Sequence, residues 1–291
     1  MQINPLLKNL NEKYLYLLEL ELTDEIISKF AGVRYVLLQG SNDRAKNLAR
    51  KLALRFSKIS PEFFEPKDIT PTSRYKIYRV GNVLSVSHGM GNTSVIALLH
   101  DLTKILYYAG NNNLEYIRIG TSGGIGVDPG TVVITEKAFM PTLVDYLPLP
   151  SLDKNINIST IFNSKLANEI YKVQPRGLDF QVILANTIAA DDFYLGQGRF
   201  DGAITPKYDH AFRSEYFENV RALGIRNFEM ESTALAAFCN QVEIPATMLA
   251  VTLVNRLLGD QVTATPEELA GFSDRSQLVA INYLNTKTDL I

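Results

Sequence analysis

The sequence contains no tryptophan, one cysteine and three histidines among its 291 residues. A lone cysteine cannot form an intrachain disulfide, and the apolar residues before Cys239 indicate that its side chain packs in the core. The histidines are spread along the chain without a cysteine or carboxylate at the spacing of metal ligands, so we expect no metal site. No apolar run approaches about 18 residues, and no basic segment precedes an apolar one at the N-terminus. We therefore expect a cytoplasmic protein without a membrane partner.

The sequence also lacks an excess of charge of either sign. The net charge is -2 and the lysines and arginines are scattered, which argues against a surface that binds nucleic acid. With 46% hydrophobic residues, the chain can bury one large core or two small ones. No internal repeat and no linker rich in glycine, serine or proline divides it. Nucleic acid is therefore not an expected partner.

Apolar runs of strand length alternate with apolar residues at helical spacing along most of the chain. This alternation predicts one α/β domain over residues 33–291, with a mainly parallel or mixed sheet and helices on both sides. Residues 1–32 are expected to form an irregular arm with a short helix at 24–30. Residues 57–73 are expected to form a polar connection, and residues 138–160 a surface excursion of variable shape. The predicted strands are 35–38, 74–80, 83–87, 116–119, 131–135, 181–188, a short one through 228, and 246–254, and the predicted helices are 45–56, 92–109, 162–173, 212–223, 232–241 and 273–284.

A glycine-rich stretch follows the predicted strand 116–119, with four glycines among residues 120–126. We interpret it as a turn whose backbone N–H groups approach a ligand, because glycine accepts positive φ and has no side chain in the way. Arg118, Thr121 and Ser122 could then converge on one anion. Gly40 and Arg44, between another predicted strand and helix, form a second possible anion site. An ordinary strand-to-loop turn is the alternative, and neither stretch matches a dinucleotide-binding or P-loop motif.

A second glycine-rich segment, residues 191–202, carries Phe193, Gln197 and Arg199. Gln197 and Arg199 are two residues apart, so in an extended chain both would point the same way. An amide and a guanidinium together suit the edge of a pyrimidine ring, and Phe193 could pack against such a ring. The alternative is a solvated loop with a structural arginine.

Two glutamates flank Met230 at the junction between a predicted strand and a helix. The carboxylate of Glu229 or Glu231 could accept hydrogen bonds from the vicinal hydroxyls of a sugar, with Met230 against the apolar face of the ring. Both glutamates could instead cap the helix that follows.

Four segments together, residues 117–126, 193–202, 228–232 and 251–256, resemble the nucleoside phosphorylase-I family and within it the eukaryotic uridine phosphorylases. The similarity runs from about Tyr35 to the C-terminus. It implies a single-domain, three-layer α/β/α fold with a central mixed, partly barrel-like sheet. It also implies the reversible phosphorolysis of uridine to uracil and ribose 1-phosphate in pyrimidine salvage. Inorganic phosphate is then a substrate, no cofactor is needed, and the expected assembly is a homodimer.

The resemblance also assigns residues to three parts of a site, with Arg118, Gln197, Arg199 and Glu231 expected to act most directly in catalysis. It implies that the phosphate site comprises Gly40, Arg44, Arg118, Thr121 and, from the neighbouring subunit, Arg74; that the base site comprises Phe193, Gln197, Arg199 and Arg256; and that the ribose site comprises Glu229, Met230 and Glu231.

Two positions depart from the family pattern. Leu17 stands where the family has a histidine that reaches the ribose 5′-hydroxyl across the dimer, so acceptance of 5′-deoxy or 2′-deoxy analogues is a hypothesis. Leu195 replaces a residue that is usually polar or proline.

Two alternative functions stay open. One is a purine nucleoside phosphorylase or nucleosidase of the same fold, although Asn255-Arg256 stands where such enzymes place an aspartate. The other is a relative that binds nucleoside without catalysis.

Overall fold

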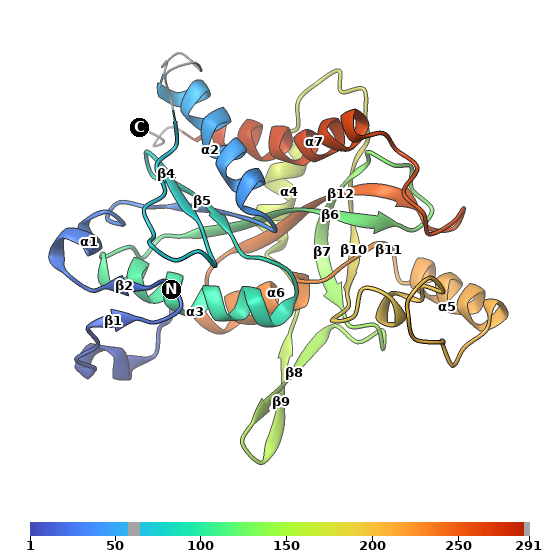
Figure 1. Cartoon of the computed structure of the whole chain (residues 1–291), viewed down its shortest axis with the longest axis horizontal. Coiled ribbons are helices and arrows are strands. Elements are labelled where there is room, and N and C mark those ends of the chain that lie inside the picture. The colour runs from blue at the N-terminus through green and yellow to red at the C-terminus, as the bar shows by residue number, and fades with distance from the viewer. Residues whose placement is uncertain (58–64, 288–291) are drawn as a thin grey trace.

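The computed structural model describes residues 1–57 and 65–287, which contain an eight-stranded mixed sheet (Figure 1). The strand order is β11-β10-β7-β12-β6-β3-β5-β4, and β11 pairs additionally with β6. This extra pairing closes five strands, β6, β12, β7, β10 and β11, into a barrel from which β3, β5 and β4 extend as a wing. The strands are β3 (Tyr35–Gln39), β4 (Ile77–Val80), β5 (Val83–Ser87), β6 (Glu115–Gly124), β7 (Val132–Phe139), β10 (Val182–Ala189), β11 (Ile225–Glu229) and β12 (Ala246–Asn255).

Helices cover both faces of this sheet, as the α/β pattern predicts (Figure 1). One face is covered by α2 (Asn42–Ser57), α4 (Ser164–Lys172) and α7 (Pro266–Asn285), and the other by α3 (Asn92–Tyr108) and α6 (Ser232–Val242). Each side has its own hydrophobic cluster, and α5 (His210–Ala222) packs against β11 in a third. Cys239 is buried in α6, as expected. The predicted three-layer architecture with a partly barrel-like sheet is confirmed.

The strand β6 is longer than predicted and changes the interpretation of the glycine-rich stretch. It pairs in parallel with β3 through Glu115–Ile119, in parallel with β12 through Tyr116–Ser122, and antiparallel with β11 at Gly123 and Gly124. The expected turn after Ile119 is therefore wrong, because the chain stays extended through the glycines. Of the glycines in this stretch, Gly126 has a positive φ, at 68°.

The arm at residues 1–32 is more regular than expected. It contains a 3-10 helix, η1 (Pro5–Asn9), a short hairpin of β1 (Tyr14–Leu15) and β2 (Leu20–Glu21), and α1 (Asp24–Ser28). Leu15, Leu18 and Leu20 are buried in the cluster that α3 shares with α6. Lys104 on α3 pairs with Glu12 of the arm at 2.7 Å. These contacts fix the arm on the body of the protein.

Two further predictions are corrected by the structure. Residues 138–160 contain a regular antiparallel hairpin, β8 (Tyr146–Ser151) and β9 (Lys154–Ser159), which projects from the body (Figure 1). Pro148 and Pro150 are compatible with it because a two-stranded ribbon leaves each strand one free edge. The last helix begins at Pro266 rather than Ser273, because Thr265 and Glu268 form a capping box. The predicted connection 57–73 lies partly outside the described residues.

Candidate active site

A cavity opens where β3, β5, β6, β10, β11 and β12 end, and it gathers most of the predicted site residues. The carboxyl ends of the parallel strands β3, β5, β6 and β12 lie at one edge of the sheet, and the antiparallel pairing of β11 with the end of β6 brings the carboxyl ends of β11 and its parallel neighbour β10 to the same place. Arg74 is an exception, since it is exposed just before β4 and does not line this cavity. The predicted residues that line it are Gly40, Arg44, Arg118, Thr121, Phe193, Gln197, Arg199, Glu229, Met230, Glu231 and Arg256.

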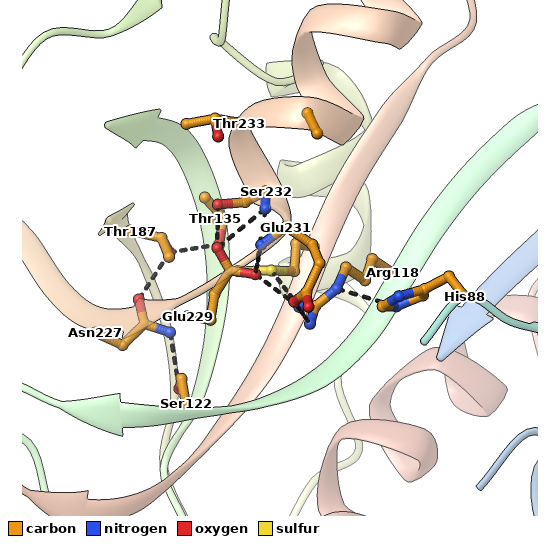
Figure 2. Close-up of polar contacts among 12 residues, drawn as sticks. His88, Arg118, Ser122, Thr135, Thr187, Asn227, Glu229, Glu231, Ser232 and Thr233 are labelled. Carbon is orange, nitrogen blue, oxygen red and sulfur yellow. Dashed lines mark hydrogen bonds and ion pairs between the residues drawn. The ribbon is translucent and has the colours of Figure 1, made fainter. Parts of the chain in front are cut away.

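Arg118 lies buried at the centre of the site, with its guanidinium surrounded by protein atoms (Figure 2). Its Nη1 lies 3.0 Å from Glu229 Oε2 and 2.9 Å from Met248 Sδ, and its Nη2 forms an ion pair with Glu231. Its Nε donates to His88 Nε2 at 3.3 Å. All three nitrogens are therefore engaged, and two carboxylates share one positive charge.

The glycines of β6 provide the space that this arrangement needs. Gly120 is two residues beyond Arg118, so both face the same side of the strand. A Cβ atom at Gly120 would lie 2.5 Å from Arg118 Nη1, and one at Gly123 would lie 2.7 Å from Arg256 Cδ. Any side chain at either position would displace an arginine. The glycine-rich stretch thus brings two guanidinium groups close to the sheet rather than forming a turn.

Glu229 and Glu231 have different structural roles at the start of α6. Glu229 accepts from the backbone N–H groups of Glu231 and Ser232 at 2.9 and 3.0 Å, so the helix-capping interpretation holds for it. Burial raises the pKa of Glu229, and Arg118 opposes this rise. Glu231 accepts from the N–H of Gly91 at 2.6 Å. Burial works against ionisation of Glu231, but Arg118 and the Gly91 N–H together bring its pKa below the usual range. Glu231 is the ionised partner that faces the cavity.

Arg44 presents the opposite situation to Arg118. Its Nε donates to Ser41 Oγ at 3.2 Å, and none of the residues described in the structure accepts a hydrogen bond from its two terminal nitrogens. Burial and the nearby charge of Arg118 lower the pKa of Arg44. Gly40 lies beside it, and a Cβ there would be 3.2 Å from Arg44 Nη2. A cationic group with unused donors beside a second cation is well suited to an anion.

Gln197 and Arg199 both line the cavity, although not for the expected reason. The chain is not extended here: Leu195–Gln197 form a 3-10 turn, and Gly198 follows in the left-handed region with φ 69°. Reversal at Gly198 brings both side chains to the same side. Gln197 is a buried residue that lines the cavity, and none of the described residues forms a hydrogen bond with its side-chain amide. Leu195, at the start of the turn, does not line the cavity.

Arg199 is held in place by Asp201, which accepts from its Nε and Nη2 at 2.8 and 2.6 Å. The pairing raises the pKa of Arg199 and lowers that of Asp201 to about 2. The guanidinium carbon also lies 4.7 Å from the centre of the Phe193 ring. One terminal nitrogen of Arg199 remains available to the cavity.

Arg256 supports the site from behind. Its Nη1 donates to the backbone oxygen of Gln197 at 2.6 Å, and its Nε and Nη2 donate to Asp260 Oδ1. Asp201 and Asp260 were missed in the sequence analysis. The signal that could have found them is a carboxylate two residues after Arg199 and another four residues after Arg256. Acidic partners of this kind compensate the positive charge of a buried arginine.

Hydroxyl and amide side chains continue the polar network into the barrel (Figure 2). Asn227 donates to Ser122 Oγ at 3.0 Å and accepts from Thr187 Oγ1 at 2.7 Å, and Thr187 contacts Thr135 at 2.8 Å. These four residues come from β11, β6, β10 and β7. Buried polar groups of this kind specify strand register, because a shift would leave them unpaired.

No group of three potential metal-ligating side chains occurs within residues 1–57 and 65–287. In the same part of the chain, no helix is both long and apolar enough to cross a membrane.

The sequence model of the phosphorylase superfamily matches residues 34–286. The chain belongs to this superfamily. It is 35% identical to uridine phosphorylase 1 of Mus musculus over 97% of this chain and 90% of that protein. It is also 34% identical to inactive uridine phosphorylase B of Schistosoma mansoni, over 90% of this chain and 88% of that protein.

The fold matches a solved member of the superfamily along its full length. The structure of uridine phosphorylase from Schistosoma mansoni in complex with uracil has a TM-score of 0.92 and 33% identity, covering 99% of this chain and 100% of that chain. The resemblance to the nucleoside phosphorylases, and among them to the uridine phosphorylases, is therefore confirmed.

We predict that Gly120→Ala destabilises the protein by about 3 kcal/mol or more, because displacing Arg118 leaves buried carboxylates without their cation. Chemical unfolding measures this change. Gly271→Ala on α7 is the control, since nothing lies within 4 Å of a Cβ there. Alanine in a helix interior should raise stability by up to about 1 kcal/mol. Equal stability of the two variants would contradict the steric role of Gly120.

A second prediction concerns His88, whose pKa burial and the charge of Arg118 lower to about 3. In the unfolded chain the pKa is about 6.5, so between these values the unfolded state binds more protons and stability falls as pH decreases. From pH 6.5 to 5 this group alone should cost about 2 kcal/mol. His88→Gln, which keeps an acceptor for Arg118, should flatten the unfolding free energy in this window. His210→Gln, at an exposed histidine, should not, and similar curves for both variants would refute the assignment.

Proposed function

We propose that this protein is a uridine phosphorylase, a pentosyltransferase that converts uridine and phosphate to uracil and ribose 1-phosphate in pyrimidine salvage. The observation that carries the proposal is the distribution of unused donors in one cavity. Arg44 offers its two terminal nitrogens, Gln197 its side-chain amide and Arg199 one terminal nitrogen, and all three line the same cavity as Glu231. The relatives named for uridine phosphorylase activity support the same function.

The proposed phosphate site comprises Gly40, Arg44, Arg118 and Thr121. Arg44 supplies donors that have no protein partner among the described residues, and the positive charge of the nearby Arg118 adds to the attraction for an anion. Because the charge of Arg118 is shared by two glutamates, a phosphate dianion needs further cations. The exposed Arg74 of a second copy would provide one, which is why we propose a homodimer as the active assembly.

The proposed base site reads uracil through polar groups on one edge. Gln197 can donate to and accept from the ring, Arg199 can donate to a carbonyl, and Phe193 packs against the ring. Arg256 acts indirectly, because it donates a hydrogen bond to the backbone oxygen of Gln197 and so positions that residue. When the glycosidic bond breaks, negative charge develops on uracil. Donors fixed in advance for that charge can each be worth about 3 kcal/mol.

Glu231 and Met230 form the proposed ribose site. Glu229 fixes the turn that contains them by accepting hydrogen bonds from the backbone N–H groups of Glu231 and Ser232. Glu231 keeps lone pairs for the ribose hydroxyls while bound to Gly91 and Arg118. It thereby fixes the sugar between phosphate and base, so that attack by phosphate on the anomeric carbon becomes nearly unimolecular. Phosphate supplies the attacking oxygen and offsets the positive charge on the sugar. The reaction uses no cofactor and no protein nucleophile.

We infer further that the protein works in the cytoplasm. We also infer that residues 33–291 form the catalytic domain and that residues 1–32 form an arm. The superfamily match over residues 34–286 supports the division. The arm is held on α3 by the ion pair of Lys104 with Glu12 and by the hydrogen bond from Leu17 N to Asp101 Oδ2 at 2.9 Å.

Two alternatives are separated by one set of assays. A purine enzyme needs an acid near the base, yet Asn255 does not line the cavity and Arg256 is committed to Asp260. A binding protein without turnover has a precedent in the relative named as inactive. Release of base from uridine, thymidine, inosine and adenosine, with and without phosphate, distinguishes all three functions.

We predict that phosphate-dependent uracil release falls about 100-fold or more in Gln197→Leu, because the leucine removes a donor fixed for the developing charge. A spectrophotometric assay of uridine phosphorolysis measures it. Gln174→Leu, on the loop after α4 and away from the cavity, is the matched control and should keep full activity. Unchanged turnover in Gln197→Leu would show that the base is read elsewhere.

A further prediction follows from Leu17. Leucine cannot donate to the ribose 5′-hydroxyl, so uridine and 5′-deoxyuridine should have kcat/KM values within about threefold of each other. Leu17→His should widen the preference for uridine to about tenfold, the worth of one hydrogen bond. Leu6→His, at an exposed position of the arm, controls for a general effect of histidine. Strong discrimination by the wild-type protein would contradict this interpretation.

A further inference from the structure

Asn92, the first residue of α3, is buried at a point where three separate parts of the site meet. Its Nδ2 donates to Asp191 Oδ1 at 2.8 Å and lies 3.1 Å from Thr233 Oγ1. Its Oδ1 accepts from the N–H of Ala234 at 3.2 Å. One amide therefore joins α3 to the start of α6 and to the start of the base loop, which we define as residues 191–201.

The contacts to α6 replace a missing cap. The N-cap residue of α6 is Glu231, whose carboxylate binds Arg118 and Gly91 and makes no bond to the helix that follows. The first N–H groups of a helix have no partner inside it. Glu229 satisfies Ser232, and Asn92 satisfies Ala234 from another helix. Asn92 thereby leaves Glu231 free for the cavity.

The contact to Asp191 fixes the base loop where the loop begins. Asp191 precedes Phe193 by two residues, and the same loop carries Gln197 and Arg199. Farther along the loop, Arg256 holds the backbone of Gln197. Asp191 and Phe193 are themselves exposed, so packing contributes little to holding the beginning of the loop.

The neighbouring residue links the same segment to the ribose side. Gly91, with a φ of 87°, donates its N–H to Glu231. The dipeptide Gly91-Asn92 thus holds the ribose carboxylate through its backbone and the base loop through its side chain. A shift of either partner would change the distance between the two ends of the site.

We propose that Asn92 is a positioning residue that sets the base loop relative to the ribose carboxylate, acting through Asp191, and so determines affinity for the pyrimidine base. The inference deepens the proposed function and rests on it. An amide is required because the group must donate to a carboxylate on one side and accept from N–H on the other. Aspartate at position 92 would meet Asp191 as a like charge.

The test exchanges the two polar groups. Asn92→Asp should raise the KM for uridine and the dissociation constant for uracil about tenfold, since it replaces a hydrogen bond by repulsion. The double variant Asn92→Asp/Asp191→Asn rebuilds the bond in the opposite direction and should return both values to within about threefold of wild type. The KM for phosphate should stay within about twofold throughout, because Arg44 is untouched.

Asn112→Asp, an exposed substitution just after the same helix, is the control for added charge. Thermal unfolding shows whether each variant is folded. If the double variant is as impaired as Asn92→Asp, or if the KM for phosphate rises in proportion to that for uridine, Asn92 is a general structural residue and the proposal is overturned. Absence of turnover in the wild type would overturn the proposed phosphorylase activity. The dissociation constants for uracil, measured by calorimetry in the same variants, would still decide the role of Asn92. Absence of uracil binding by the wild type would overturn both.

Discussion

The positive charge of Arg118, buried between Glu229 and Glu231, is the constraint on which the rest of the site depends. A buried charge is stable only when compensated, and loss of one partner typically costs about 3–5 kcal/mol. The pairing therefore holds β6 against the end of β11 and fixes the first turn of α6. Because β6 also pairs with β3 and β12, the same arginine links the wing of the sheet to the barrel.

This constraint explains why the middle of β6 is rich in glycine. Gly120 and Gly123 leave room for the guanidinium of Arg118 and the side chain of Arg256, which then lie against the sheet. The cost is a strand whose glycines contribute no packing and lose more conformational entropy on folding. Pairing with neighbours on both sides offsets that cost.

The remaining polar groups divide into supports and free donors. Asp201 and Asp260 immobilise Arg199 and Arg256, whereas Arg44 and Gln197 keep donors without protein partners among the described residues. Preorganised donors of this kind need no rearrangement when charge develops. In the proposed reaction these donors would bind phosphate and the pyrimidine anion, and the protein would supply position and charge.

The sequence by itself determined the α/β class, most strands and helices, and more than half of the residues that line the cavity, since apolar periodicity and the four motifs are local properties of the chain. The extended path through Gly120 was mispredicted, because its pairing partners on β12 lie far away in sequence. The turn that ends at the left-handed Gly198 was also mispredicted, although it is closed locally by the bond from Gly198 N to Leu195 O. The supporting roles of His88, Asp201 and Asp260 were missed, since the spacing of the two aspartates from Arg199 and Arg256 makes pairing possible but does not show that the arginines are buried, and His88 lies 30 residues from Arg118. Only the tertiary structure decided which side chains are consumed by their neighbours and which remain free, because that depends on burial and on partners more than a hundred residues apart, such as Arg118 and Glu231.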